Sequence, residues 1–439
     1  MKVREFRLLL LGAALLRALS SPAAEPADLP PVEVVSRALA AHPLVRAAES
    51  GIALEQARSE QLEAGPHEVA LTLGNSRRRE TLTDTRYAEQ EIGLQRAFRL
   101  PGKRGADQQL GAAGLALALA QRGEARHETS RLLLSLWFNV LREASTLTEW
   151  EAQATVLSEQ VRAARRRAEL GDASALDQSL AEAQLAQAEA QRSQAGTRLQ
   201  LARNELAQHF PTLPTPPAVL AEPQPPLQGL AQWREQILNH HHGLALARTT
   251  AQRQRIGAGR AELERLPDPT LGLHWASERG GQEKLFGVQL IIPLPGGARA
   301  AASRGAQAEA EIANAREAAA LAQAEAEVRR TVTQAEAAYR HWQQQSQVAA
   351  KMDKNARLLD RAWRLGEGQI SELITARRLA VDAQLAAVQA RAEARESHYR
   401  LMLDAHQLWP LDGHPDETPG EAALKEQRER LAHLLPVAP

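Results

Sequence analysis

The fold is decided by residues 69–102, VALTLGNSRRRETLTDTRYAEQEIGLQRAFRLPG, and by residues 270–296, TLGLHWASERGGQEKLFGVQLIIPLPG. In each stretch, two short runs alternate apolar residues with small or polar ones, and a polar segment separates the runs. Alternation with a period of two is typical of β-strands whose two faces differ. The sequence therefore predicts β-hairpins over 67–98 and 269–292, with polar loops over 75–86 and 277–284.

The segments around the hairpins are Ala-rich and helical in pattern, and aromatic residues make up only 3% of the chain. No proline occurs from Lys103 to Glu169, which predicts one continuous helix about 100 Å long. Each hairpin is preceded by a shorter helix and followed by a long helix, a Gly-centred turn and a returning helix. The expected helices cover residues 32–64, 103–169, 173–209, 230–266, 297–365 and 369–410.

The two halves of the chain form an internal repeat with the same order of predicted elements. The spacing between Pro101 and Pro295 is within one residue of the spacing between Gly171 and Gly366. A proline-rich segment separates the copies, which is typical of a linker. The predicted organisation is listed in chain order: a first repeat at 32–210, a linker at 211–229, a second repeat at 230–410 and a tail at 411–439.

The first residues have the pattern of an export signal. Lys2, Arg4 and Arg7 precede an apolar block, and small residues follow it near Ala24, as in a cleaved signal peptide. The sequence therefore predicts a signal peptide at 1–24; an unprocessed amphipathic helix is the alternative. Lys plus Arg and Asp plus Glu are both 53, so the chain carries no net charge that would attract nucleic acid.

Strands with one apolar and one polar face are suited to a wall between lipid and water. Four strands from one chain cannot close a barrel, for which about eight are needed, and open sheet edges are not tolerated in lipid. We therefore expect a homo-oligomer in which the hairpins of several copies complete one barrel. The alternative is a soluble four-stranded sheet that the helices cover.

The order of these features resembles that of the outer membrane efflux proteins, the TolC-like family, over essentially the whole mature chain. The resemblance rests on the repeat, the strand–loop–strand units and the Leu-Pro-Gly exits that contain Pro101, Gly102, Pro295 and Gly296. Further matching motifs are LGDAS at 170–174, IIPLPG at 291–296 and LGEGQISEL at 365–373. Their spacing is most similar to that of the cobalt–zinc–cadmium cation-efflux branch.

The resemblance implies a mainly α fold with a small β part, assembled as a homotrimer. Four transmembrane β-strands per protomer would close a 12-stranded barrel, and the long helices would form a periplasmic α-helical barrel. Residues 211–232 and the tail would form an equatorial belt. The implied location is the cell outer membrane with a large periplasmic part. The implied partners are outer membrane lipid, a periplasmic membrane-fusion adaptor and an inner-membrane resistance–nodulation–division pump.

No catalytic constellation is present in the sequence. It has no Walker loop and no nucleophile elbow, and no pair of carboxylates suggests a catalytic pocket. We expect a passive conduit rather than an enzyme, with no cofactor and no metal site. The chain has no cysteine, which excludes disulfides and thiolate ligands. Side chains of His240, His241 and His242 would point in different directions on one helix, so surface histidines are expected there.

The candidate periplasmic aperture residues are acids beside the two Gly-centred turns: Asp172, Asp177, Glu367 and Glu372. In a trimer each would form a ring of three carboxylates, and such rings favour cations. The resemblance places an aperture acid at Glu372, whereas Thr375 stands where a second acid is expected. Helix capping is the alternative, because Ser174 and Asp177 have capping-box spacing.

Other residues also have expected roles. The helix-tip turns contain Gly171, Gly366 and Gly368. Trp275 and Phe286 are expected at the membrane interface, where aromatic residues gather, with core packing as the alternative. His274 is expected on the barrel interior. The arginines at 77–79 are expected outside the cell, either solvated or near lipid phosphates.

The sequence therefore predicts an outer-membrane channel of a tripartite efflux system that passively conducts its substrates, heavy-metal cations being the first expectation. The alternatives are a soluble periplasmic coiled-coil scaffold or adaptor without a pore, and a TolC-like duct for drugs or secreted polypeptides. An adaptor would carry a lipoyl-like β-rich unit between its helical arms, and the sequence has no segment of that kind.

Overall fold

The computed structural model describes residues 27–217, 219–226 and 228–409. The expected signal peptide at 1–24 and tail at 411–439 lie outside the described residues. The chain divides into two compact units. We call residues 41–130, 229–330 and 404–439 the sheet unit, and residues 1–40, 131–228 and 331–403 the hairpin unit. Each unit is described by itself.

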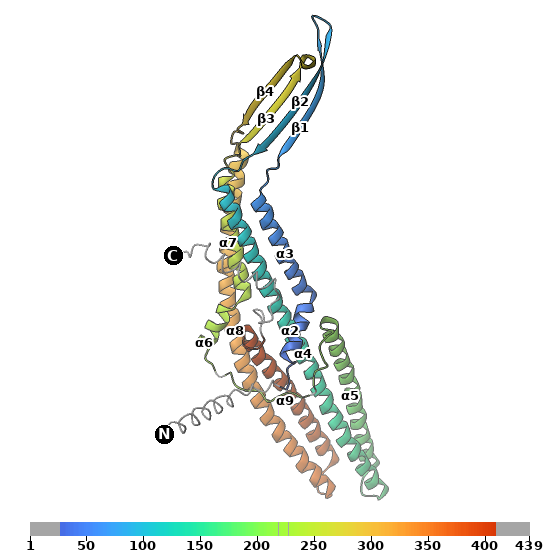
Figure 1. Cartoon of the computed structure of the whole chain (residues 1–439). Coiled ribbons are helices and arrows are strands. Elements are labelled where there is room, and N and C mark those ends of the chain that lie inside the picture. The colour runs from blue at the N-terminus through green and yellow to red at the C-terminus, as the bar shows by residue number, and fades with distance from the viewer. Residues whose placement is uncertain (1–26, 218, 227, 410–439) are drawn as a thin grey trace, which may run out of the picture. The chain divides into compact units, whose positions relative to one another are not determined.

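The sheet unit contains a single antiparallel four-stranded sheet in the order β1-β2-β3-β4 (Figure 1). Its strands are β1 (Ala70–Glu80), β2 (Thr85–Ala97), β3 (Thr270–Glu278) and β4 (Glu283–Ile291). The strands β1 and β2 belong to the first half of the sequence and β3 and β4 to the second, so the central β2–β3 pairing joins the two repeats. The predicted mainly α fold with a small β part is confirmed.

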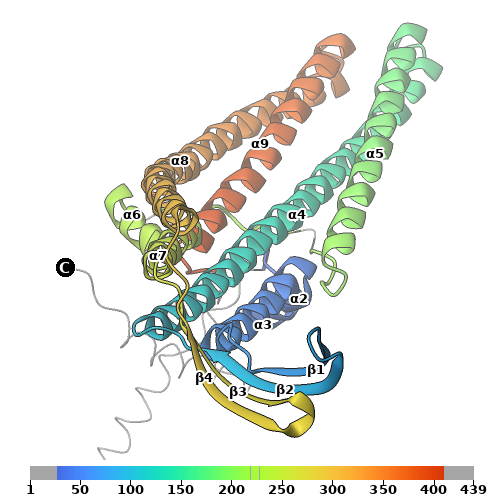
Figure 2. The ribbon, with the colours of Figure 1, turned by 90° about the horizontal axis from the view of Figure 1, so that it is seen from above.

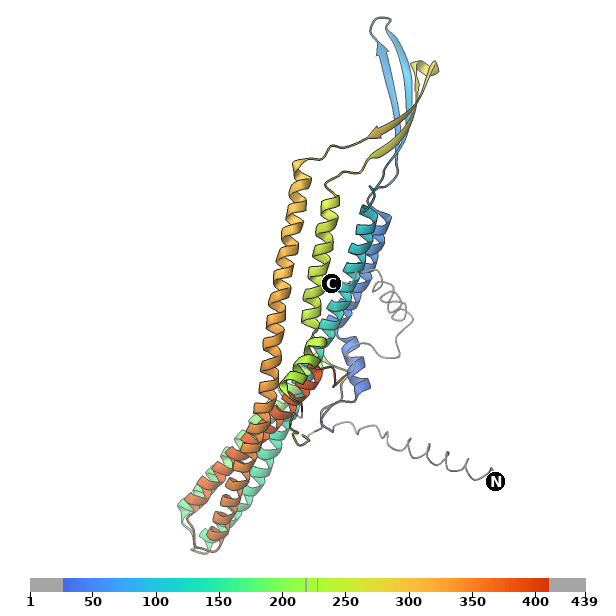
Figure 3. The ribbon, with the colours of Figure 1, turned by 90° about the vertical axis from the view of Figure 1, so that its left-hand side faces the viewer.

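The predicted loops at 75–86 and 277–284 are wrong in extent. The β1–β2 pairing continues to Glu80↔Thr85, and β3 and β4 are joined by a short 3-10 segment, Arg279–Gly281. The β1–β2 hairpin therefore projects beyond the β3–β4 hairpin (Figure 3). Cross-strand pairs support this polar extension, among them Arg78–Glu89 at 3.1 Å. The sequence predicted a loop here because the charged residues do not alternate with apolar ones. Opposite charges on paired strands nevertheless stabilise a two-stranded ribbon.

The helices recur in the same order in each half. The first half has α2 (Val32–Ala41), α3 (Pro43–Ala64), α4 (Lys103–Glu169) and α5 (Ala175–His209). The second half has α6 (Leu230–Asn239), α7 (His242–Leu263), α8 (Gly297–Arg364) and α9 (Ile370–Asp404). Within the hairpin unit, α4 lies beside α5 and the C-terminal part of α8 beside α9 (Figure 2). The last helix ends at Asp404, earlier than the expected end at 410.

The helices expected over 32–64 and 230–266 are each broken once, which corrects the prediction. His42 begins α3, and its Nδ1 accepts a hydrogen bond from Leu44 N at 3.4 Å. His241 begins α7 in the same way, accepting from Leu244 N at 3.1 Å. Because a side chain that caps a helix start satisfies an otherwise free backbone N–H, a histidine at each break can begin a new helix. The break is thus part of the repeat.

Small apolar residues form most of the core of the hairpin unit. Near the helix tips, the buried cluster contains Val161, Ala164, Ala181, Trp363, Ile370 and Leu373. Farther along α4 and α9, the rings of Phe138 and Tyr399 pack with centroids 5.7 Å apart. In the part of the chain that the structure describes, no helix has the length and apolar character needed to cross a membrane.

Candidate functional site

The strand register separates the sheet into two chemically different faces. On one face, Leu71 pairs with Leu94 and Leu273 with Val288; the neighbouring rows are also apolar except for Arg96, which opposes Leu271. The apolar members of this face, which we call the apolar face, are Leu71, Leu73, Ile92, Leu94, Leu271, Leu273, Trp275, Phe286, Val288 and Leu290. Leu73 is 71% exposed and Val288 is 65% exposed. The alternative of a sheet covered by this chain's own helices therefore does not fit.

The opposite face is polar and carries small residues, so we call it the polar face. Gly93, His274 and Gly287 lie side by side across β2, β3 and β4. The imidazole of His274 lies over Gly287, where an added Cβ would approach its Cε1 to 2.1 Å. Five carboxylates share this face: Glu80, Glu89, Glu91, Glu278 and Glu283. The only basic strand residue opposing them in these four described strands is Arg78, which pairs with Glu89 and Glu278.

Trp275 and Phe286 are direct cross-strand partners on the apolar face. The next row of that face contains Ser277 and Lys284, so the two aromatic rings mark one edge of the apolar band. Phe286 is 73% exposed. Since aromatic rings favour the boundary between hydrocarbon and water, their position fits the expected interface role.

Charged residues tie the sheet to the helices at the Leu-Pro-Gly exits. Lys103 begins α4, is 1% exposed, and donates from Nζ to Leu266 O at 2.7 Å and Asp268 Oδ1 at 2.8 Å. His67 Nε2 lies 2.7 Å from Asp268 Oδ2, and Leu100 N donates to Oδ1 at 2.9 Å. Asp268 therefore joins segments from both repeats. The two exits differ in backbone, because Gly102 has φ of +88° and Gly296 is not among the residues with positive φ.

The junction at Asp268 gives stability a dependence on pH. Burial acts to raise its pKa, but the hydrogen bonds from His67, Lys103 and Leu100 N outweigh it and lower the pKa to about 2. A carboxyl whose folded pKa is depressed stabilises the fold above its unfolded pKa and loses this contribution as pH falls through the folded value. We expect thermal stability in detergent to fall between about pH 4 and pH 2. Asp268→Asn should cost roughly 1.5–3 kcal/mol at neutral pH and flatten that slope; an unchanged slope would contradict this role.

The two tip turns are built alike and are joined by an arginine that sequence reasoning missed. Gly171 and Gly366 have φ of +75° and +82°, a conformation that favours glycine. Arg167 of α4 pairs with Asp172 at 2.9 Å and donates to the carbonyl of Trp363 at 2.8 Å. Its guanidinium also lies 5.1 Å from the Trp363 ring centroid. The α4–α5 tip is thereby tied to the α8–α9 tip.

The four candidate aperture acids differ in their surroundings. Asp177 forms a capping box with Ser174, the interaction that the sequence offered as the alternative for this residue. Asp172 is held by Arg167. Glu372 lies in the first turn of α9, where its charge suits the helix dipole, and Glu367 lies in the turn between α8 and α9. Gly368 packs against the α8 end, where an added Cβ would meet Trp363 N at 3.3 Å.

The consecutive histidines do not lie on one exposed helix, contrary to the expectation. The α6–α7 break separates them, and the ring of His406 stacks on both His240 and His242 with centroids 4.8 Å apart in each case. His127 of α4 lies 5.3 Å from the His242 ring centroid. Among the described residues, no group of three or more histidine or carboxylate side chains is arranged to hold a metal ion.

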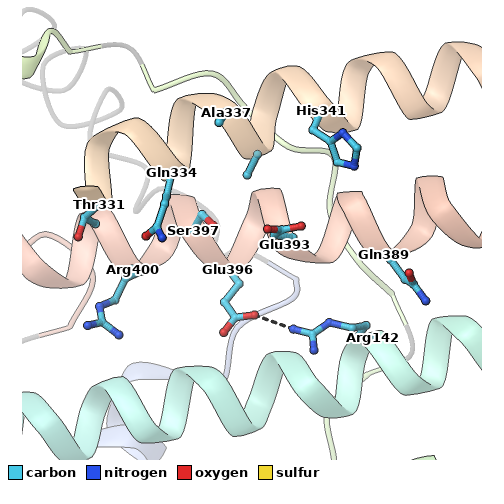
Figure 4. A pocket seen from close by; sticks show the side chains of 11 residues that line it. Arg142, Thr331, Gln334, Ala337, His341, Gln389, Glu393, Glu396, Ser397 and Arg400 are labelled. Carbon is cyan, nitrogen blue, oxygen red and sulfur yellow. Dashed lines mark hydrogen bonds and ion pairs between the residues drawn. The ribbon is translucent and has the colours of Figure 1, made fainter. Parts of the chain in front are cut away.

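A polar pocket of about 770 Å³ lies between α4, α8 and α9 in the hairpin unit (Figure 4). Arg142 donates to Glu396 at 2.8 Å across it, and Glu393 and His341 also line it. Burial raises the pKa of Glu396, although the charge and hydrogen bond of Arg142 act in the opposite direction. Two carboxylates therefore share a pocket where the sequence suggested none. The sequence did not reveal this pair because Glu393 and Glu396, three residues apart on a polar helix, have the pattern of an ordinary solvent-exposed helix face.

A buried ionic cluster in the hairpin unit was also missed. Arg395 donates from Nε and a terminal nitrogen to the two carboxylate oxygens of Asp28, both at 2.8 Å. Tyr399 Oη donates to Asp28 at 2.8 Å, and Ala221 N donates at 3.2 Å. Asp28 O accepts from Trp137 Nε1 at 2.9 Å. The cluster fixes the segment before α2 and the proline-rich linker onto α4 and α9.

No protein-family model matches the sequence, and no curated protein matches it. Solved structures do match. The outer membrane protein VceC of Vibrio cholerae has a TM-score of 0.71 at 19% identity, over 85% of this chain and 95% of its own. The Campylobacter jejuni CmeC outer membrane channel gives 0.73 at 14% identity, over 90% and 88%.

The MtrE outer membrane channel of Neisseria gonorrhoeae, in its open state, has a TM-score of 0.58 at 18% identity, over 89% of this chain and 94% of its own. Identities this low establish the fold alone. The chain accordingly has the fold of TolC-like outer membrane channels.

Proposed function

We propose that this protein is the outer-membrane channel of a tripartite efflux system and conducts its substrates passively. The observation that carries the proposal is the two-faced sheet, with an apolar face that the single chain leaves exposed. Two outer strands, β1 and β4, leave open edges that lipid does not tolerate. A homotrimer would pair these edges and close a 12-stranded barrel whose polar face lines the bore.

The remaining parts of the proposal rest on the resemblance to the TolC-like family. The helix tips with Asp172, Asp177, Glu367 and Glu372 would surround the periplasmic aperture and meet a membrane-fusion adaptor. An inner-membrane resistance–nodulation–division pump would supply the substrate. The fold shared with CmeC and MtrE, whose structures are described as outer membrane channels, supports this role.

Heavy-metal cations are the substrates that the charges favour. Five glutamates and one arginine lie on the polar face of the strands, so three protomers would surround the bore with a strong excess of negative charge. Rings of carboxylates attract cations and repel anions. A strain that lacks the protein should become sensitive to zinc, cobalt, cadmium or copper. Unchanged tolerance to all four metals would contradict heavy-metal cations as substrates, and drugs or secreted polypeptides would become the candidate substrates.

Single-channel recording tests the conduit itself. Purified full-length protein added to a planar lipid bilayer should give step-like currents, with reversal potentials that indicate preference for cations. Cross-linking in detergent should trap a trimer. A protein that leaves the outer-membrane fraction in a carbonate wash and gives no currents would be a soluble scaffold instead.

Arg167→Ala should favour the open aperture. The substitution removes the contacts to Asp172 and Trp363 O, and hydrogen bonds to charged groups contribute about 1.5–3 kcal/mol each. We expect at least a tenfold increase in the fraction of time that the channel spends in its largest conductance state. Arg165→Ala is the matched control, because within the described residues Arg165 pairs only with Glu182 of the same helical hairpin, at 2.9 Å. Equal effects of the two substitutions would refute a restraint between the tips.

A further inference from the structure

Basic residues continue the apolar face of the sheet beyond its aromatic edge. Lys284 lies two residues before Phe286 on the same face of β4, and on the first hairpin that face continues through Arg77, Arg79 and Arg86. We call these four residues the basic ladder. Arg79 and Arg86 are direct cross-strand partners, although like charges in such positions destabilise a strand pair. The adjacent positive charges of Arg79 and Arg86 therefore destabilise the strand pair, and both lie on the face that continues the apolar face.

The two faces of the projecting ribbon have opposite charge. The carboxylates of the strands, from Glu80 to Glu283, all lie on the polar face, and no Asp or Glu of the four described strands lies on the apolar face. Arg79 pairs with Asp84 of the turn at 2.5 Å. Among the residues that the structure describes, Arg77, Arg86 and Lys284 have no ion pair, and all three are exposed. Their charges are available to an external anion.

The ladder begins in the headgroup layer of a membrane and continues outward from it. Lys284 lies two residues beyond Phe286 and Arg77 four residues beyond Leu73, about 7 and 13 Å along the strand. A strand tilt of about 40° reduces these to roughly 5 and 10 Å above the hydrocarbon edge. The headgroup layer is about 5–7 Å thick on each side, so Lys284 lies within it, whereas Arg77 lies above it with a side chain long enough to extend back toward it. Arg86 opposes Arg79, two residues beyond Arg77, so the charges of the ladder span several depths.

We propose that the basic ladder binds the phosphates of a multiply phosphorylated glycolipid in the outer leaflet. The proposal rests on the membrane insertion argued above. Charge complementarity and continuity with the apolar face identify the occupant: acyl chains cover the leucines while phosphates meet the ladder. Guanidinium groups bind phosphate in a bidentate manner. An anionic headgroup with phosphates at more than one depth fits the ladder better than a phospholipid with a single phosphate.

The test compares full-length native protein with the triple variant Arg77→Gln, Arg86→Gln, Lys284→Gln. Arg78→Gln is the matched control, since Arg78 lies on the same hairpin but on the polar face. Each protein is reconstituted into phosphatidylcholine vesicles with and without lipopolysaccharide, and its affinity for lipopolysaccharide is measured. One basic residue near an anionic surface contributes about fivefold. The triple variant should therefore bind about a hundredfold more weakly, and Arg78→Gln at most about fivefold more weakly.

Other outcomes have distinct meanings. Equal lipopolysaccharide binding by the triple variant and native protein would contradict glycolipid binding by the basic ladder. A loss of affinity in Arg78→Gln as large as that in the triple variant would also contradict it. Full displacement of the glycolipid from the ladder by inorganic phosphate would overturn the lipid assignment in favour of a free-anion site. If native protein inserts into neither kind of vesicle, both the proposed channel function and glycolipid binding by the basic ladder are contradicted. Normal insertion of the triple variant into phosphatidylcholine, with weak lipopolysaccharide binding, supports both.

Discussion

Val288→Arg should greatly reduce stable insertion into lipid vesicles. Val288 lies in the middle of the apolar face, between Phe286 and Leu290, and is 65% exposed in the single chain. A charged residue on the lipid face of a membrane β-barrel costs about 2–4 kcal/mol near the bilayer midplane. The equilibrium between inserted and detergent- or urea-solubilised protein should shift by roughly 30-fold to 1,000-fold. The measurement is a urea titration of refolding into vesicles.

Gln289→Arg is the matched control for this substitution. It introduces the same side chain one position along β4, on the polar face beside Gly272. Because a bore-facing arginine stays in water, insertion should change little while the conductance falls. If both variants insert as well as the native protein, the apolar face does not contact lipid and the proposed architecture is wrong.

Arg395→Met should lower the free energy of unfolding by about 3–5 kcal/mol, the typical cost of removing one partner from a buried ion pair. Asp28 is fully buried, and Arg395 is 6% exposed. Burial alone would raise the pKa of Asp28, but the hydrogen bond and charge of Arg395, with the hydroxyl of Tyr399, lower it. The variant would leave that carboxylate without its main counterion. Chemical unfolding in detergent would measure the loss.

Two further variants separate the ion pair from general packing. Arg391→Met is the control, because Arg391 donates to the carbonyls of Leu220 and Ala221 rather than to a carboxylate. It should cost less than Arg395→Met, because it leaves no buried charge without its counterion. The double variant Asp28→Ala, Arg395→Met should be more stable than Arg395→Met alone, since no charge remains buried. A double variant that is less stable than the single one would contradict this explanation.

The long helices could be predicted closely because their determinants are local. The start of α4 at Lys103 and its end at Glu169 match the proline-free segment between Gly102 and the Gly171 turn. The apolar face of the sheet was equally visible, since alternation along each strand fixes which side chains share a face. Where the strands extend beyond the apolar band, at residues 75–80 and 85–86, the apolar alternation ends and the sequence predicted a loop. The pairing there depends on cross-strand charges rather than on apolar alternation.

Contacts between distant residues could not be predicted from the same patterns. Arg167 meets the Trp363 carbonyl across 196 residues of sequence, and Arg395 meets Asp28 across 367. Each of these arginines lies in an Ala-rich helix with other arginines nearby, so neither stands out in a single sequence. The break at His240 and His241 was missed for another reason. Histidine is not a usual capping residue, and the helical pattern continues through it.

Cysteine scanning of β4 tests the central claim most directly, because the chain has no cysteine of its own. Single cysteines would replace Leu285, Gln289 and Ile291 on the polar face, and Phe286, Val288 and Leu290 on the apolar face. In proteoliposomes, a water-soluble maleimide should label the first set. Fluorophores attached before reconstitution to the second set should be quenched by a lipid-phase quencher. Equal labelling of both sets by the water-soluble reagent, without quenching from the lipid, would contradict a sheet that separates lipid from an aqueous bore.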